Sequence, residues 1–399
     1  MNYILFDDNS WDNLLPLTFT RPVAEIRIGI LTIKEKWDKY LNTICSYKTK
    51  DYLTIKYQLI SKNENILING SILPNQKIID EINSLKQNQC LIKDGVIIAI
   101  ALNKKDTEEF KYSDHSKYEV KLLKEVLNKI NFAYDIFAKN DFAILSDFEL
   151  ITKNRTSQEL SKTNNVKGIE NIFVEEGAVV EFSTLNATNG KMYIGRNVEI
   201  MEGTLIRGPF AICENSTLKM GAKIYGATTI GPYSKVGGEV NNSVIMGYTN
   251  KAHDGFLGNS VLGEWCNIGA DSNNSNLKNN YTEIKLWSYP EERFVKTGLY
   301  FCGLIMGDHS KCGINTMFNT GTVVGVSSNI FGSGFPRNFI QSFMWGGAEG
   351  FTTYSLAKAL ETAEKVMERR NKKLDEIDKK ILSAIFENTE KYRSIIKQK

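Results

Sequence analysis

The sequence predicts an α/β domain, a parallel β-helix and a helical tail, in that order along the chain. Short apolar segments separated by turn residues predict the first region. An aliphatic residue at every sixth position between Ile194 and Val236 predicts the second. Apolar residues at helical spacing among dense Lys and Glu predict the third, after Gly350.

Length and composition limit the possible functions. The 399 residues suffice for two or three domains, and 42% hydrophobic with 24% charged residues is usual for a globular protein. A net charge of +3 leaves no large basic field, so nucleic acid is not an expected partner.

The chain also lacks the sequence signals of secretion and of membranes. Six cysteines without a CxxC pair predict reduced thiols rather than a disulfide framework. The N-terminus has no basic region, and no apolar stretch reaches the ~18 residues of a membrane helix. We therefore expect a cytoplasmic protein without membrane partners.

Residues 1–152 are expected to form the α/β domain. The segments 3–6, 66–68, 90–92 and 96–101 are the predicted strands, and Asp94-Gly95 predicts a hairpin turn between the last two. Residues 26–40 and 122–136 are the predicted helices. The polar residues 153–165 are the predicted linker.

The six-residue repeat decides the fold of residues 166–350. A period of six fits neither an α-helix nor strand alternation, but it fits a triangular coil with one inward aliphatic residue on each side. Stacked coils share one apolar core. A β-sandwich with repeated turns is the alternative. The inward series consists of Ile194, Ile200, Ile206, Ile212, Leu218, Ile224, Ile230 and Val236.

A second series follows each inward residue by four positions. These residues, at the predicted corners, are small with the exception of Phe210: Val198, Thr204, Phe210, Ser216, Ala222, Thr228, Ser234 and Val240.

The repeat is interrupted twice and then resumes. Residues 241–255 cross a change of phase, after which Phe256, Leu262 and Ile268 are the expected inward residues. Residues 271–303 form a long insertion, and long insertions in solenoids often carry function. The inward series then continues with Met306, Cys312, Phe318, Val324 and Ile330. Residues 351–399 are the predicted helical tail.

The segment from Glu239 to Asn276 resembles a known acetyltransferase. Its His253-Asp-Gly-Phe-Leu-Gly-Asn and Asn267-Ile-Gly-Ala runs, followed by Asn276, agree in spacing with the family of bifunctional N-acetylglucosamine-1-phosphate uridyltransferase/glucosamine-1-phosphate acetyltransferases. The resemblance implies a left-handed β-helix and a homotrimer with acetyl-CoA sites between subunits. It also implies that His253 is the general base for acetyl transfer, that Asn276 binds the sugar and that Asn267 lies near the transferred acetyl group.

The segment departs from the family pattern at positions that contact substrate. Phe256 replaces a tyrosine, Asn241 replaces a phosphate-binding lysine, and Asp271 replaces a glycine. Lys223, Lys219 and Arg207 are the candidates to supply the missing positive charge, and the sequence does not choose among them.

The three histidines of the chain differ in their expected positions and roles. His253 interrupts the six-residue phase, so it is not expected to fill the core; a surface histidine without catalytic role is the alternative. His309 is expected at a coil corner, and His115 in a polar loop, both without catalytic role.

The N-terminal region resembles sugar-1-phosphate nucleotidyltransferases through Leu14-Leu-Pro-Leu-Thr and Arg21-Pro-Val-Ala, and nearly the whole chain resembles a divergent form of the two-part proteins found in Bacteroidetes. It lacks the glycine-rich phosphate loop, the lysine after proline and one metal-binding aspartate of that family. Asp7, Asp8 and Arg21 are the candidate nucleotide-binding groups, with a strand-end turn and a structural salt bridge as the alternatives. No metal ligands are assigned; Mg²⁺ is expected only if this domain is active.

The sequence therefore favours an enzyme of sugar-nucleotide biosynthesis. It would transfer acetyl from acetyl-CoA to an amino-sugar phosphate resembling glucosamine-1-phosphate, with a linked nucleotidyltransferase-like domain that takes a nucleoside triphosphate. A nucleotidyltransferase alone, or a non-catalytic scaffold that binds sugar nucleotides, is the alternative. The sequence does not select the acceptor sugar or the nucleotide base.

Overall fold

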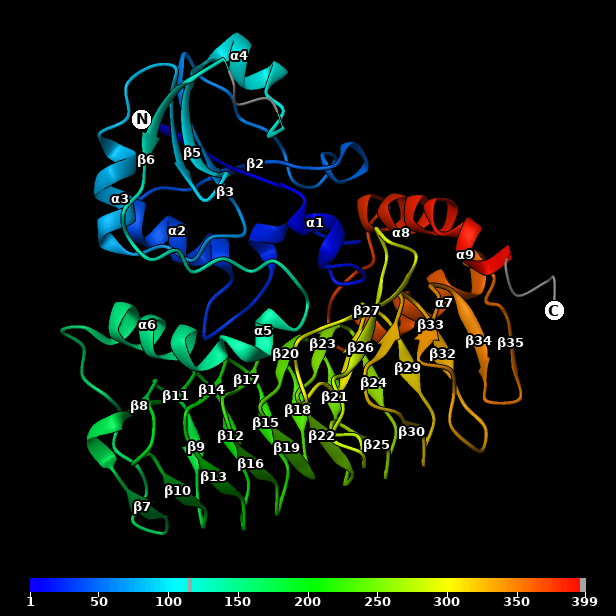
Figure 1. Cartoon of the computed structure of the whole chain (residues 1–399). Helices are drawn as coiled ribbons and strands as arrows, with labels where there is room; N and C mark the ends of the chain where they lie inside the picture. The colour runs from blue at the N-terminus through cyan, green and yellow to red at the C-terminus, as the bar shows by residue number, and fades with distance from the viewer. Residues whose placement is uncertain (114–116, 395–399) are drawn as a thin grey trace. The chain divides into compact units, whose positions relative to one another are not determined.

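The computed structural model describes residues 1–113 and 117–394. The chain divides into two compact units (Figure 1). The first comprises residues 1–14, 20–26 and 31–132, and the second comprises 15–19, 27–30 and 133–399. The predicted fold class is confirmed: an α/β N-terminal region, a parallel β-helix and a short helical C-terminal region.

A six-stranded mixed sheet forms the first unit. Its strand order is β2-β1-β3-β5-β4-β6, and β1 pairs in parallel with both neighbours. The strands are β1 (Asn2–Phe6), β2 (Ser46–Lys48), β3 (Glu64–Asn69), β4 (Gln89–Lys93), β5 (Val96–Asn103) and β6 (Glu119–Leu122). The helices are α1 (Ser10–Asn13), α2 (Ile33–Leu41), α3 (Gln76–Asn83) and α4 (Lys104–Glu109).

Local sequence explains two of these elements. Asp94 and Gly95 have φ of 49° and 76°, as the predicted hairpin turn between β4 and β5 requires. Thr32 and Glu35 form a capping box at the start of α2, so the helix begins later than the predicted residue 26.

The predicted helix over residues 122–136 is wrong. Leu122 ends β6, the following residues are irregular, and only the short α5 (Asp135–Ala138) is helical. Residue 129 instead forms an antiparallel bridge with Ile72. Backbone hydrogen bonds to residues 71–73, which follow β3, outweigh the weak helical periodicity of this segment.

Three parallel sheets form the sides of the β-helix. The first sheet contains β7 (Asn165–Lys167), β10 (Thr184–Asn186), β13 (Leu205–Arg207), β16 (Lys223–Tyr225), β19 (Glu239–Asn241) and β22 (Phe256–Gly258). It continues as the pair β25 (Asn273–Asn274) and β30 (Met317–Phe318).

The second sheet contains β8 (Ile172–Val174), β11 (Met192–Ile194), β14 (Phe210–Ile212), β17 (Thr228–Ile230), β20 (Val244–Gly247), β23 (Val261–Glu264), β28 (Leu304–Met306), β31 (Thr322–Val324) and β33 (Phe339–Ile340).

The third sheet contains β9 (Val179–Val180), β12 (Glu199–Ile200), β15 (Thr217–Leu218), β18 (Lys235–Val236), β21 (Asn250–Lys251), β24 (Asn267–Ile268), β29 (Lys311–Cys312), β32 (Asn329–Ile330), β34 (Met344–Gly347) and the antiparallel β35 (Gly350–Thr353). Figure 1 shows the strands stacked coil upon coil.

The six-residue repeat is explained by the buried core. Every predicted inward aliphatic residue from Ile194 to Val236, and again from Met306 to Ile330, belongs to one continuous hydrophobic cluster. The hydroxyl groups at the corners bond to backbone carbonyls: Ser216 donates to Gly231 O at 2.9 Å, and Thr204 to Met201 O at 2.8 Å. Small hydroxyl residues therefore fit the corners without leaving buried polar groups unpaired.

The coils contain fewer residues where the six-residue phase is lost. Thr217 pairs with Lys235 across a full coil of eighteen residues, whereas Lys235 pairs with Asn250, only fifteen residues later. The expected inward residue Phe256 is therefore wrong by one position. Its neighbour Leu257 is 3% exposed and joins the core.

Left-handed residues at one corner of successive coils carry a stack of rings. Tyr233, Tyr248, Trp265 and His309 all have φ between 51° and 62°. The ring centroids of Tyr248 and Trp265 lie 4.2 Å apart, and those of Trp265 and His309 lie 6.2 Å apart with nearly parallel planes. His309 therefore lies at a coil corner, as expected, and packs in this stack.

The insertion and the tail pack together at the end of the β-helix. The hairpin of β26 (Lys285–Ser288) and β27 (Arg293–Lys296) presents Trp287, which stacks on Phe339 at 4.1 Å. Tyr289 contacts Tyr392 edge to face, in the last of the helices α7 (Leu356–Glu368), α8 (Glu376–Asn388) and α9 (Glu390–Ser394). The insertion thus buttresses the C-terminal helices.

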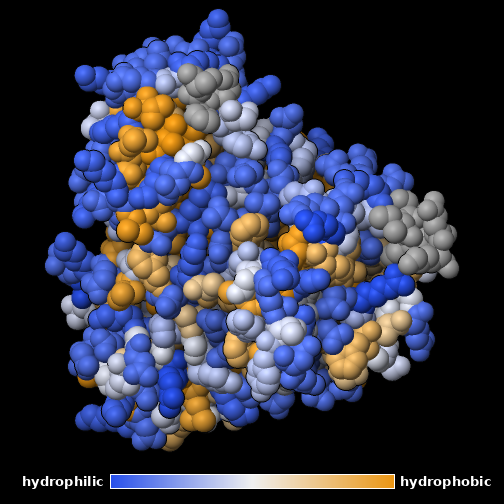
Figure 2. Space-filling view, in the orientation of Figure 1, coloured by the Kyte–Doolittle hydropathy of each residue, from blue (hydrophilic) through white to orange (hydrophobic). Residues whose placement is uncertain are grey.

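Two surface observations complete the fold. None of the helices in the described parts of the chain has the length and apolar character needed to span a bilayer. The face drawn in Figure 2 is mostly hydrophilic, with small apolar patches.

Candidate functional site

His253 lies at the corner that joins β21 of the third sheet to β22 of the first sheet. Its side chain is exposed. The corner packs closely on the coil below, because a Cβ at Gly238 would lie 2.8 Å from His253 O and from the Cα of Asp254. Gly238 also has φ of 71°, so a side chain is excluded there on two grounds. The backbone that carries His253 is thereby fixed.

A buried lysine supports the same corner. Lys251 pairs with Val236 and takes the place of an inward aliphatic residue, and it is 1% exposed. Its Nζ donates to His253 O at 2.6 Å. Burial lowers the pKa of Lys251 to about 8, although the nearby Asp254 carboxylate raises it. Lysine is almost never fully buried unless it is paired, so this position has a reason other than packing.

A column of outward side chains runs along the first sheet beside this corner. Lys223 pairs with Glu239, and Glu239 pairs with Phe256, so their side chains lie on the same face. Tyr225 donates its hydroxyl to Glu239. Glu239 is the functional candidate that the sequence did not single out; its place between Lys223 and Phe256 becomes visible only through the shortened register.

Asn276 joins this column from the start of the insertion. Its Nδ2 donates to Asn259 Oδ1 at 2.8 Å. A Cβ at Gly258 would lie 2.7 Å from Asn276 Nδ2 and 2.4 Å from Phe256 Cζ. The absence of a side chain at Gly258 therefore allows Phe256 and Asn276 to approach each other.

Asn267 lies on a different face from Asn276. It belongs to β24 of the third sheet and accepts a hydrogen bond from Asn250 Nδ2 at 2.9 Å. It lines a pocket of about 450 Å³ that α7 covers. The corner of His253 lies on the edge that the first and third sheets share. His115 lies outside the described residues.

In the first unit, Asp7 and Asp8 follow β1, as expected of polar groups at a strand end. Asp7 accepts hydrogen bonds from Val23 N at 2.9 Å and Thr49 Oγ1 at 2.5 Å. Burial raises the pKa of Asp7 to about 7 although these bonds lower it. This carboxylate is thus held by protein donors.

Asp8 is held by a lysine that the sequence did not indicate. Its carboxylate accepts from Ser10 N at 2.9 Å and from Asn69 Nδ2 at 2.8 Å, and it lies 3.1 Å from Lys129 Nζ. Burial raises the pKa of Asp8, but Lys129 and the hydrogen bonds hold it below its ordinary value. Lys129 falls in the segment expected to be a helix, so no signal pointed to it.

These two carboxylates do not fit a Mg²⁺ site. All four of their oxygens meet protein donors, and Lys129 already supplies a cation. No group of three or more His, Cys, Asp or Glu within residues 1–113 and 117–394 is arranged to hold a metal. Arg21 is buried, at 5% exposed, and its carbonyl accepts from Trp11 Nε1.

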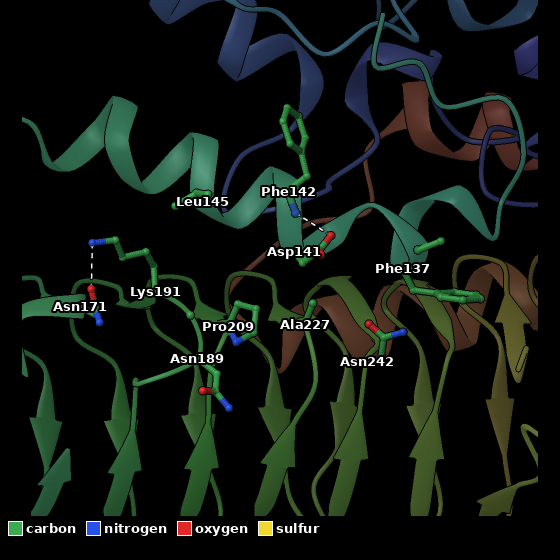
Figure 3. A pocket seen from close by; sticks show the side chains of 12 residues that line it. Phe137, Asp141, Phe142, Leu145, Asn171, Asn189, Lys191, Pro209, Ala227 and Asn242 are labelled. Carbon is green, nitrogen blue, oxygen red and sulfur yellow. Dashed lines mark hydrogen bonds between the residues drawn. The ribbon is translucent and has the colours of Figure 1, made fainter. Parts of the chain in front are cut away.

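A larger cavity lies elsewhere and contains none of the predicted site residues. It has a volume of about 790 Å³ between α5, α6 (Asn140–Thr152) and the edge of the second sheet. Figure 3 shows Phe137, Asp141 and Phe142 on the helical side and Lys191 and Pro209 on the side of the coils. Its lining includes the carboxylate of Asp141 but no histidine.

Comparison with known proteins agrees with this organisation. Residues 3–156 match the family model described as Sugar nucleotidyl transferase, so the N-terminal domain is nucleotidyltransferase-like. The chain is 24% identical over 388 residues to the "Bifunctional sugar-1-phosphate nucleotidylyltransferase/acetyltransferase" of Sulfurisphaera tokodaii, covering 83% of this chain and 96% of that protein.

Two further similarities are shorter or more distant. "Bifunctional protein GlmU" of Methanocaldococcus jannaschii is 35% identical over 89 residues, which cover 22% of this chain and 21% of that protein. A solved UDP-N-acetylglucosamine acyltransferase from Campylobacter jejuni is 15% identical, covers 56% of this chain and 95% of that chain, and has a TM-score of 0.24. The resemblance expected from the sequence is confirmed by the relatives.

Lys251→Met tests the buried lysine. Because the pKa of Lys251 is lowered to about 8, the unfolded chain binds more protons than the folded one between pH 8 and the ordinary lysine value. Wild-type stability therefore gains up to ~3 kcal/mol as the pH rises through this window, and the variant lacks that gain. Urea denaturation at several pH values measures the difference in unfolding free energy between the two proteins.

Lys167→Met, at an exposed strand position, is the matched control, and its effect on stability should stay constant over the same pH range. A difference between wild type and Lys251→Met that does not change with pH would contradict the burial of a titrating amine at this position.

Proposed function

We propose that the β-helix transfers an acetyl group from acetyl-CoA to an amino-sugar phosphate in sugar-nucleotide biosynthesis. The observation that carries the proposal is the grouping around the His253 corner: an exposed imidazole on fixed backbone, beside a face that carries Lys223, Glu239, Phe256 and Asn276. The two-part relatives, named as nucleotidylyltransferase/acetyltransferase, support it.

Each residue then has a defined role. The sugar nitrogen attacks the thioester carbonyl carbon, the C–S bond breaks, and the CoA thiolate leaves. His253 takes the proton that the attacking nitrogen loses and passes it to the thiolate. Lys223 attracts the sugar phosphate, Asn276 hydrogen-bonds the sugar, and Phe256 packs against it. Asn267 lies toward the acetyl donor, on the other side of the corner.

Glu239 adds a charge that the sequence hypothesis lacked. Its carboxylate lies between Lys223 and Phe256 and is held by Tyr225. An anion there attracts a positively charged group of the substrate, such as a sugar ammonium. It also limits the positive field of Lys223, so the phosphate is expected at the Lys223 end of the column.

For the N-terminal domain we infer at most weak nucleotidyl transfer to a sugar-1-phosphate from a nucleoside triphosphate. Each oxygen of Asp7 and Asp8 accepts a hydrogen bond from the protein and Lys129 pairs with Asp8, which does not fit Mg²⁺, so no step is assigned to a metal. The pocket beside Asp8 has a volume of about 230 Å³, below the ~300–1,000 Å³ typical of ligand pockets. These features of the N-terminal domain favour two alternatives: a chain in which only the β-helix is catalytic, or a non-catalytic scaffold. We expect these reactions in the cytoplasm.

The homotrimer expected from the sequence remains a prediction. The first sheet leaves apolar side chains exposed, with Leu205 50%, Tyr225 38% and Val166 37% exposed, so its outer face suits contact with another subunit. Flat sides of a triangular solenoid pack around a threefold axis, which closes the assembly. Light scattering at micromolar concentration should give three times the chain mass; a monomer would count against the assembly and against any site shared between subunits.

For the nucleotidyltransferase-like domain, we expect slow turnover of UTP or dTTP with a hexose-1-phosphate. Phosphoryl chemistry depends on charge neutralisation and positioning, and here Lys129 already pairs with Asp8 while Asp7 accepts hydrogen bonds from Val23 N and Thr49. Pyrophosphate release measures the rate, with Asp7→Ala and Arg21→Ala as variants. Brisk Mg²⁺-dependent turnover that survives both changes would show that these residues are not the site.

His253→Ala should reduce acetyl transfer by at least ~100-fold, about 2.7 kcal/mol of barrier, because it removes the imidazole that accepts the proton. The measurement is CoA release with glucosamine-1-phosphate as acceptor. His309→Phe is the matched control: it keeps a ring in the corner stack and should leave transfer nearly unchanged. If the His253 variant retains most activity, or if wild type acetylates no amino sugar, the scaffold alternative gains.

A further inference from the structure

The pocket between the third sheet and α7 is strongly cationic. Four basic side chains line it: Lys235 from β18, Lys311 from β29, and Arg369 and Arg370 from the end of α7. None of the residues that line it is Asp or Glu. Within residues 1–113 and 117–394, none of these four side chains forms an ion pair with a carboxylate.

The four cations repel one another. Burial lowers the pKa of Lys235, and the charges of Arg370, Lys219 and Arg369 lower it further, with only Glu199 acting in the opposite direction. Burial also lowers the pKa of Arg370, with Arg369 adding to the effect, and lowers that of Lys311 to about 8. Like charges held together at partly buried positions are destabilising unless an anion joins them.

The C-terminal dipole of α7 is not sufficient to explain this cluster. It amounts to about half an elementary charge and acts on the last turn only. It therefore accounts for Arg369 and Arg370, which follow α7, but not for Lys235 and Lys311, which project from the sheet.

The remaining residues that line the pocket suit an organic ligand better than a simple ion. Asn250 and Asn267 offer amides, Thr362 offers a hydroxyl, and Tyr248 and Val366 offer apolar surface. The volume of about 450 Å³ lies within the range of small-molecule sites. Arginine pairs present planar forks that match phosphate oxygens.

We propose that this pocket binds the phosphate-rich end of a nucleotide-type ligand, with at least two phosphoryl groups placed among Lys235, Lys311, Arg369 and Arg370. The shared chemistry has two sources: the phosphorylated adenosine diphosphate portion of coenzyme A, or the diphosphate of a sugar nucleotide. The first source rests on the proposed acetyl transfer, since His253 lies on the edge between this face and the face of Lys223. The second would make the pocket a site for the nucleotide product.

Binding without turnover tests the proposal. Isothermal titration of the full-length protein with pyrophosphate, ADP, coenzyme A and UDP-N-acetylglucosamine should show binding that weakens with salt, whereas pantetheine, which lacks phosphate, should bind poorly. Lys235→Gln and Arg370→Gln should each weaken binding about tenfold or more, because each removes a charge-assisted contact. Lys373→Gln removes the same charge from the same segment outside the pocket and is the matched control.

The arms of the experiment separate the sources. If Lys235→Gln and Arg370→Gln lose binding of coenzyme A selectively, the pocket binds the acyl donor. If they lose binding of UDP-N-acetylglucosamine selectively, the pocket binds the sugar nucleotide. His253→Ala should bind the phosphate compounds as wild type does. The binding test of the pocket therefore does not depend on whether the protein transfers acetyl groups. If no phosphate compound binds wild type, or if both pocket variants match Lys373→Gln, the proposal is overturned.

Discussion

Every coil of the β-helix must return each strand to its place above the strand of the previous coil. This requirement fixes one inward residue on each side, because the hydrogen bonds between coils and the apolar core share the same register. The position of every outward side chain follows from it. Lys223, Glu239 and Phe256 form a column for no reason other than that their strands pair.

The candidate site lies where this register is shortened. Between Lys235 and Asn250 the coil has lost three residues, and Lys251 occupies a core position there. A buried lysine in place of an aliphatic residue lowers stability, since its charge loses hydration. In exchange, the Lys251 ammonium holds the backbone carbonyl of His253 by a hydrogen bond. Proteins violate the rules of the core chiefly at functional sites, and this corner fits that pattern.

Sequence was sufficient wherever the repeat was regular. The inward residues from Ile194 to Val236 follow from a period that fits neither helices nor ordinary strands. The sequence revealed the change of phase but not its exact register, so Phe256 was placed one position away from the buried Leu257. Lys129, which pairs with Asp8, and the pocket of Arg370 depend on segments brought together only by tertiary packing, so periodicity could not reveal them.

The two carboxylates after β1 and the four cations below α7 illustrate opposite electrostatic states. Asp8 is buried and paired with Lys129, and each oxygen of Asp7 and Asp8 accepts a hydrogen bond from the protein. Lys235, Lys311, Arg369 and Arg370 have no carboxylate among the described residues that line their pocket. A ligand adds most binding free energy where the protein has left a charge unbalanced. The chemistry of this chain is therefore expected in the β-helix, because in the N-terminal site Asp8 is already paired with Lys129.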